Sequence, residues 1–213
     1  PEESGEWTPG AAGRWWLHHS LCFLKEAIEK RGGHLILREG PTAEALYKIA
    51  EETHAAAVYY QSAVEPWARK QEAQVSVYLK SNDIPCYALP PDLLVYPGQL
   101  LNRNEEPYKV FTPFWKEASS RLSDPLLLPE PDRWSAPPIS SLQPEDFGLL
   151  PDHPWTKGLA AAWMPGEAGA HRRFEQWISG AIAEYSVHRE IPSLEGTSRL
   201  SPHLHFGEIS IRA

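Results

Sequence analysis

The chain lacks the features that define several large classes of protein. It has two cysteines, Cys22 and Cys86, too far apart for a C-x-x-C pair, which argues against a disulfide scaffold or a zinc ribbon. No apolar run approaches the roughly 18 residues that span a membrane, and no secretory signal opens the chain. Acidic residues outnumber basic ones, with 28 Asp and Glu against 20 Lys and Arg, and the net charge is −8. This charge argues against indiscriminate nucleic-acid binding, but it does not exclude a local basic groove. These absences predict a protein of a reducing compartment without a membrane partner.

The first third of the 213 residues alternates helix and strand. Leu17, Leu21, Leu24 and Ile28 recur at helical spacing and predict a helix over 14–31. Further helices are expected from Pro41 onward and over 65–80, and short β-branched or apolar runs predict strands at 34–37, 56–60 and 84–89. This alternation is typical of a parallel α/β sheet. Because such a sheet normally begins with a strand, we expect one or more strands to be missing at its N-terminal side.

Proline and helical periodicity divide the rest of the chain. Eight prolines between residues 125 and 154 rule out a long helix there and predict an extended linker. Phe174, Ile178, Ile182 and Tyr185 then form an apolar stripe that predicts a helix over 167–188. The predicted domains are therefore 1–118, an incomplete α/β domain; 119–155, a linker; and 156–213, the start of a helical domain.

The residues near the C-terminus suggest an anion site. Ser201-Pro202 predicts a helix start with a hydroxyl N-cap and a proline at the first helical position. Thr197, Ser198 and Ser201 add hydroxyls beside the unpaired amides of a helix N-terminus, which suits a phosphate. The alternative is a plain capped helix that binds nothing.

Three stretches resemble the photolyase/cryptochrome family. The run GTSRLSPHLHFGEIS over 196–210 resembles its flavin-phosphate motif, and Tyr185, Arg189 and Pro192 have the family's spacing to it. The run RWWLHHSL over 14–21 is similar to the first long helix of the light-harvesting domain, and PYKVFTPFW over 107–115 resembles the exit from that domain. The loop 61–64 departs from the Asn-Arg-Arg-Tyr often found in relatives.

The resemblance implies a fold and a set of binding residues. The fold is a Rossmann-like α/β antenna domain followed by the beginning of an all-α FAD-binding domain. Arg189 resembles a DNA-contacting position, and Glu106 resembles a carboxylate that binds an antenna chromophore of the methenyltetrahydrofolate type, although a plain charged loop residue is an equal alternative. The residues that resemble flavin contacts are Tyr185, Thr197, Ser198, Arg199, Leu200 and Ser201.

No catalytic residue and no metal site is predicted within the chain. The family's photoreduction tryptophans are expected beyond Ala213, and the tryptophans present are interpreted as core and interdomain fillers. Neither the His18-His19 pair nor the His203/His205 pair has the spacing to chelate one metal ion.

The function implied by the resemblance is light-driven repair of ultraviolet-induced pyrimidine dimers in DNA. A cryptochrome-type blue-light receptor and an inactive binding fragment are the alternatives. The chain is expected to be truncated at both ends and inactive by itself. The whole protein is expected to be a monomer in the bacterial cytoplasm, associated with the nucleoid when DNA is bound.

Overall fold

The structure is a computed structural model that describes residues 8–96, 98–122 and 129–212. The chain forms two compact units, each built from separate stretches of sequence. The helical unit contains Pro1–His54 and Pro131–Ile209, and the sheet unit contains Ala55–Glu130 and Ser210–Ala213. Among the described residues no helix is both long and apolar enough to cross a membrane.

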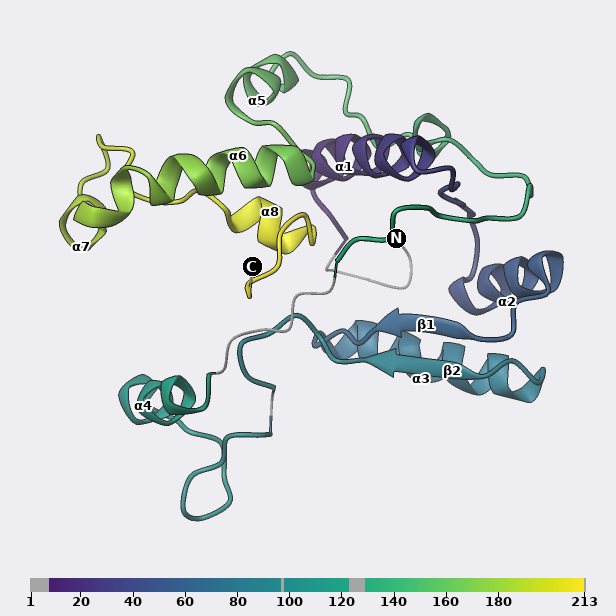
Figure 1. The fold of residues 1–213 in the computed structure, drawn as a ribbon, viewed down its shortest axis with the longest axis horizontal. Helices are drawn as coiled ribbons and strands as arrows, with labels where there is room; N and C mark the ends of the chain where they lie inside the picture. The colour runs from purple at the N-terminus through teal and green to yellow at the C-terminus, as the bar shows by residue number, and fades with distance from the viewer. Residues whose placement is uncertain (1–7, 97, 123–128, 213) are drawn as a thin grey trace. The chain divides into compact units, whose positions relative to one another are not determined.

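The sheet unit is built around two parallel strands joined by a helix (Figure 1). Strand β1 (Val58–Gln61) pairs with β2 (Cys86–Leu89), with Val58 opposite Cys86. Between them runs α3 (Pro66–Ser81), where Val75 and Leu79 are buried and Tyr78 is exposed. The sequence places all three on the inner side of this helix, so the expectation holds for Val75 and Leu79 and is wrong for Tyr78. The expected parallel α/β arrangement is confirmed here.

Other parts of the sheet unit are loops and one further helix. Helix α4 (Phe111–Arg121) begins in the stretch 107–115 that resembles the antenna-domain exit, and it buries Ala118. Residues Ser210–Arg212 also belong to this unit, because Ser210 Oγ donates to Asp92 and the Arg212 guanidinium donates to the carbonyl oxygens of Leu93 and Leu94.

The helical unit contains the long first helix α1 (Ala11–Lys30), as predicted. Figure 1 shows α1 beside α6, and α8 lies nearby in the same unit. The remaining elements of this unit are α2 (Thr42–Thr53), the 3₁₀ turn η2 (Pro144–Phe147), α5 (Thr156–Ala162), α6 (Glu167–Ile178), the 3₁₀ turn η3 (Ala181–Glu184), α7 (Tyr185–His188) and α8 (Ser201–His205).

The strand expected at 34–37 is not formed. The Leu37 amide donates to Ser141 Oγ at 2.8 Å, and the Leu142 amide donates to the Leu37 carbonyl at 3.1 Å. The run therefore pairs with the proline-rich segment, where Pro137 and Pro138 lack the amide hydrogens that a ladder needs.

The helix expected over 167–188 is interrupted. It ends at Ile178, where Ser179 Oγ donates to the Glu175 carbonyl at 2.7 Å and Gly180 takes a non-helical conformation. A Ser-Gly pair both offers the backbone another hydrogen-bond partner and lowers helix propensity. Ile178, Ile182 and Tyr185 of the predicted stripe are consequently exposed.

The proline-rich segment is largely without regular structure, as expected, apart from η2. Its residues 123–128 lie outside the described part of the chain. The predicted domain boundaries near residues 118 and 155 stay a prediction.

Candidate functional site

The stretch that resembles a flavin-phosphate motif lies against α7. Gly196 makes this packing possible, because a Cβ atom at that position would lie 2.4 Å from His188 Cβ and 2.6 Å from the His188 carbonyl carbon. Such distances are far inside van der Waals contact, so only glycine lets the two backbones approach. The structure thereby brings the loop 197–201 next to the turn that carries Tyr185 and Arg189.

Tyr185 and Arg189 form one exposed group on this turn. The Arg189 guanidinium lies 5.7 Å from the centre of the Tyr185 ring, and Tyr185 stands edge-on to Trp177 at 5.9 Å. Arg189 Nε donates to Glu190 at 2.8 Å, and this hydrogen bond, followed by one to Tyr185, raises the pKa of the Arg189 guanidinium. Arg189 therefore presents a permanent positive charge at the surface.

Arg199 is the second cation of the site. Its backbone is left-handed, with φ of 53°, and its guanidinium lies 4.5 Å from the centre of the Trp163 ring. Its Nη1 also donates to Glu195 at 3.0 Å. Stacking on a ring face restrains the guanidinium without using all of its hydrogen-bond donors, so the group can still bind an anion.

The hydroxyl groups of the motif are arranged differently from the prediction. Leu200 is the N-cap of α8, with φ of −86° and ψ of −5°, and Ser201 is the first helical residue rather than the cap. The left-handed Arg199 turns the chain so that Leu200 already has helical angles. Thr197 and Ser201 are exposed, Ser198 and Arg199 are half-buried, and Leu200 is buried.

A buried carboxylate ties the end of the motif to α1. Glu208 Oε1 accepts hydrogen bonds from the Trp16 indole at 3.0 Å and from the Gly166 amide at 2.7 Å. Glu208 Oε2 lies 2.5 Å from His203 Nδ1, and the side chains of His203 and Glu208 are only 2% and 3% exposed. We call Trp16, Gly166, His203 and Glu208 the carboxylate cluster.

Aromatic rings surround the carboxylate cluster. Trp16 stands edge-on to Trp163 at 5.5 Å and to His203 at 5.0 Å, and it stacks on Phe206 at 6.2 Å. The Arg199 guanidinium stacks on the Trp163 ring, so a continuous set of ring contacts joins α1 to the loop 197–201.

Sequence reasoning missed this cluster. The signal was present, since Trp16 and Glu208 both lie in stretches of family resemblance, but nothing in the sequence pairs residues 192 positions apart. The interpretation of the tryptophans as buried fillers holds for Trp15 and Trp16, whereas Trp115 and Trp155 are 42% and 37% exposed.

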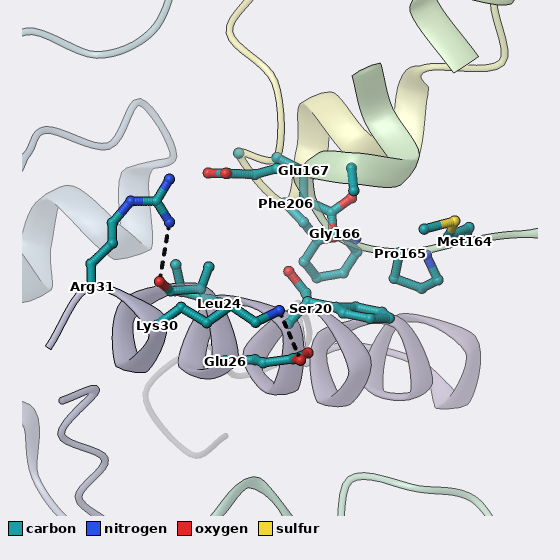
Figure 2. Close-up of a pocket in the computed structure, with 15 residues that line it drawn as sticks. Ser20, Leu24, Glu26, Lys30, Arg31, Met164, Pro165, Gly166, Glu167 and Phe206 are labelled. Atoms are coloured by element: carbon teal, nitrogen blue, oxygen red, sulfur yellow. Dashed lines mark hydrogen bonds and ion pairs between the residues drawn. The ribbon is translucent and has the colours of Figure 1, made fainter. Parts of the chain in front are cut away.

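A pocket of about 310 Å³ opens beside the cluster (Figure 2). Its walls are α1, the start of α6 and the segment after α8, with Phe206 and Leu24 facing it and the Glu26–Lys30 ion pair on the α1 side. Residues 197–201 are not among those that line it, so this pocket is separate from the predicted flavin contacts within the described part of the unit.

Glu106 lies in the sheet unit, away from the helices of the flavin motif in sequence. It is exposed on a loop closed by the Leu101–Pro107 bridge, in which the Asn102 amide donates to the Glu106 carbonyl at 2.8 Å. The Glu106 amide donates to Asn102 Oδ1 at 3.1 Å, so the backbone is fixed while the carboxylate faces solvent.

The geometry can bind a phosphate-bearing ligand. The loop 197–201 presents the exposed hydroxyls of Thr197 and Ser201 beside the restrained guanidinium of Arg199. A second guanidinium, that of Arg189, follows His188, on which Gly196 packs. Charge-assisted hydrogen bonds from arginine and hydroxyl donors are the usual means of holding a diphosphate. The donors present therefore suit a diphosphate group.

Comparison with known proteins identifies the family of the chain. The family model described as DNA photolyase matches residues 1–132, and the chain belongs to the DNA photolyase family. Among its relatives, the deoxyribodipyrimidine photo-lyase of Agrobacterium fabrum is 34% identical over 94% of this chain, and the chain spans 43% of that protein. Cryptochrome-1 of Arabidopsis thaliana is 31% identical over 100% of this chain, which spans 32% of it.

A solved structure supports the same assignment. The bacterial class III photolyase from Agrobacterium tumefaciens matches with a TM-score of 0.89 and 34% identity. It covers 94% of this chain, which spans 42% of that structure. The chain thus spans less than half of the photolyases that it resembles.

Proposed function

We propose that the protein containing this chain is a light-driven photolyase that repairs pyrimidine dimers in DNA. The family membership supports this, and the observation that carries it is the packing of Gly196, which precedes the loop 197–201, on His188, which precedes Arg189. Flavin, when bound, supplies the light-driven electron transfer, and the protein's own residues bind and orient the cofactor and the DNA.

Tyr185 and the loop 197–201 are proposed to hold FAD. The hydroxyls of Thr197, Ser198 and Ser201 and the Arg199 guanidinium donate to the diphosphate, while Leu200 anchors the loop in the core. Arg189 is proposed to contact a DNA phosphate. Glu106 is proposed to bind a folate-type antenna chromophore, with its loop holding the carboxylate at the surface.

The test of the FAD site is flavin retention by a Thr197→Ala, Ser201→Ala double variant of the protein expressed from its complete gene. Each hydrogen bond to a charged group is worth about 1.5–3 kcal/mol, so losing two weakens FAD binding by at least about 100-fold. Ser193→Ala is the matched control, because its side chain is exposed in the same segment and is outside the proposed contacts. Unchanged flavin occupancy in a folded double variant contradicts the proposed site.

A second candidate function is that of a cryptochrome-type light receptor, favoured by the similarity to Cryptochrome-1 over the entire chain. A single assay distinguishes the two functions. A photolyase restores dimer-containing oligonucleotides under blue light, whereas a receptor binds flavin and leaves the dimers intact.

A further inference from the structure

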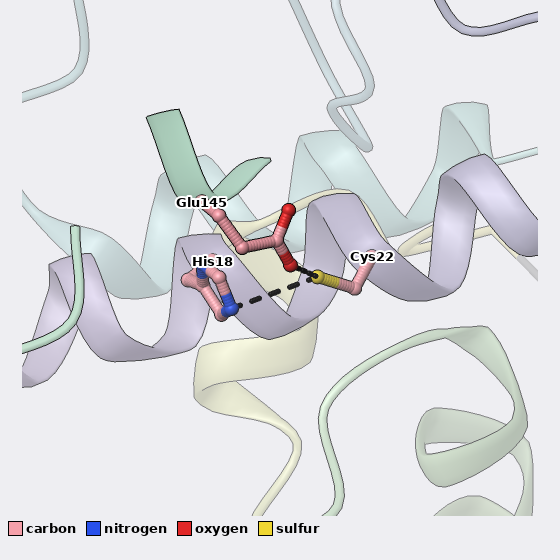
Figure 3. A group of neighbouring side chains, drawn as sticks. All are labelled: His18, Cys22 and Glu145. Carbon is pink, nitrogen blue, oxygen red and sulfur yellow. Dashed lines mark hydrogen bonds between the residues drawn. The ribbon is translucent and has the colours of Figure 1, made fainter. Parts of the chain in front are cut away.

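Three metal-ligating side chains converge on one point of the helical unit. His18 and Cys22 lie one turn apart on the same face of α1, and Glu145 of η2 faces them (Figure 3). His18 Nε2 lies 3.7 Å from Cys22 Sγ, and Cys22 Sγ lies 3.9 Å from Glu145 Oε1. The three ligand atoms are all within 4.8 Å of one another.

These separations are close to the edges of a zinc coordination tetrahedron. Zinc bonds of about 2.0–2.1 Å to nitrogen and oxygen and about 2.3 Å to sulfur give ligand-to-ligand distances of about 3.4–3.6 Å. The two contacts of Cys22 Sγ, at 3.7 Å to His18 and 3.9 Å to Glu145, exceed this by a few tenths of an ångström. Cys22 is half-buried and Glu145 is exposed, so both side chains have room to close on a cation.

The hydrogen bonds within the group leave His18 poorly satisfied. His18 is 5% exposed, its Nδ1 has no hydrogen-bond partner among the described residues, and its Nε2 meets only the sulfur atom. A thiol is a weak hydrogen-bond partner, and buried imidazoles normally have better ones. A cation on Nε2 would give this ring a strong partner.

The position of Glu145 is fixed independently of the group. A capping box links Gln143 and Asp146, in which the Gln143 amide donates to Asp146 Oδ2 at 2.7 Å. Glu145 takes no part in that cap, so its carboxylate remains available on the side of η2 that faces α1.

We propose that His18, Cys22 and Glu145 form a binding site for a divalent cation of the zinc class. One nitrogen, one sulfur and one oxygen ligand suit a borderline transition metal, whereas magnesium and calcium require oxygen ligands. Three protein ligands leave a fourth position for water on the exposed side of Glu145. The cation would fasten the proline-rich segment to α1.

The affinity is expected to be moderate. A ligating histidine usually donates its other ring N–H to a carbonyl or carboxylate, and such partners contribute about 10–100-fold in metal affinity. His18 Nδ1 has no such partner among the described residues, so the site should exchange its cation with chelators.

The experiment is a Co²⁺ titration of reduced, chelator-treated protein expressed from its complete gene. We expect one Co²⁺ per chain with the near-ultraviolet charge-transfer absorption of a cobalt–thiolate bond, and Zn²⁺ should abolish that absorption by displacement. Cys22→Ser should remove the band. Glu145→Gln, a change at an exposed position that leaves the fold intact, should weaken binding at least about tenfold.

The matched control is Cys86→Ser, since Cys86 is the other free cysteine and lies in the sheet unit. It should retain both the band and the affinity. Absence of the thiolate band in the unchanged protein overturns the proposal. Persistence of the band in Cys22→Ser, or unchanged affinity in Glu145→Gln, also overturns it. In either case the three side chains would be joined only by the hydrogen bonds of the Cys22 thiol and would bind no cation.

Discussion

Replacing Glu208 by alanine should be among the most destabilising single changes in the helical unit. The carboxylate is the shared acceptor for the Trp16 indole, the Gly166 amide and His203, at 3.0, 2.7 and 2.5 Å. Each buried donor left without a partner costs about 1–3 kcal/mol, and the change leaves up to three donors without their acceptor. We expect Glu208→Ala to lower the free energy of unfolding by about 3–5 kcal/mol, a large part of the ~5–15 kcal/mol that stabilises a typical domain.

The conservative variant separates hydrogen bonding from charge. In Glu208→Gln the side-chain oxygen can take the place of Oε1 and accept from both Trp16 and Gly166. The Gln amide group can meet His203 Nδ1 only as a donor, so His203 must be neutral with its proton on Nε2. Since the indole and the Gly166 amide keep their acceptor, we expect a loss of only about 1 kcal/mol. The expected order of stability is therefore the natural protein, then Gln, then Ala far below.

The assay is urea unfolding followed by circular dichroism. Glu26→Ala is the matched control, because the Glu26–Lys30 ion pair at 3.0 Å on α1 is 59–69% exposed and worth about 0.3–0.5 kcal/mol. A loss below about 1 kcal/mol in Glu208→Ala would refute the reasoning, since it would mean that the three donors find other partners or water.

Three further predictions concern separate parts of the molecule. Burial, followed by the charges of Glu72 and Cys86, raises the pKa of the Tyr60 phenol above its ordinary 10.0. The neutral phenol therefore stabilises the fold below about pH 10, and this contribution is lost as the pH rises through the folded-state pKa. In alkaline unfolding, Tyr60→Phe should lose less stability than the natural protein, and an identical pH profile would contradict this. Gly196→Ala should lower the free energy of unfolding by about 1–3 kcal/mol because its Cβ meets the His188 backbone, whereas Gly158→Ala, with open space around its Cβ, should not be destabilising in a denaturant titration. Arg189→Ala should weaken DNA binding for all sequences and reduce the salt dependence of the affinity by about one counterion, as measured by fluorescence anisotropy at several salt concentrations.

Local patterns predicted those elements whose stability is itself local. The stripe Leu17–Ile28 located α1 because side-chain period follows directly from backbone geometry, and the short apolar and aromatic run 56–60 located β1. The run 34–37 has the composition of a strand but does not form one, because a strand needs a neighbour that pairs with it through backbone hydrogen bonds. Among the described residues the proline-rich segment gives this run one backbone–backbone hydrogen bond, from Leu142 to Leu37, and its other contacts come from the Ser141 hydroxyl. That neighbour lies about a hundred residues away in the sequence.

The candidate sites divide in the same way. The motif 196–210 identified the loop and its hydroxyls, but the helix start shifted because the left-handed conformation of Arg199 is invisible in its residue type. The four-residue spacing of His18 and Cys22 can be read from the sequence. The third residue of the group, Glu145, cannot be paired with them in this way, because it is 123 positions from Cys22. Long-range partners of this kind depend on tertiary packing, which no local pattern encodes.

The discontinuous make-up of the two units has a consequence for how the protein emerges from the ribosome. Trp16 and its acceptor Glu208 are 192 positions apart, so at ~5–20 residues per second α1 waits about 10–40 s for its partner. During that interval Trp15 and Trp16, which are 4% and 5% exposed in the completed fold, are open to solvent and to other nascent chains. The sheet unit also remains unfinished until Ser210 and Arg212 reach Asp92 and Leu93. The helical unit is therefore complete only after Glu208 has emerged, and the sheet unit only after Arg212 has emerged. We expect the growing chain to depend on chaperones that shield aromatic surface until synthesis has passed Arg212.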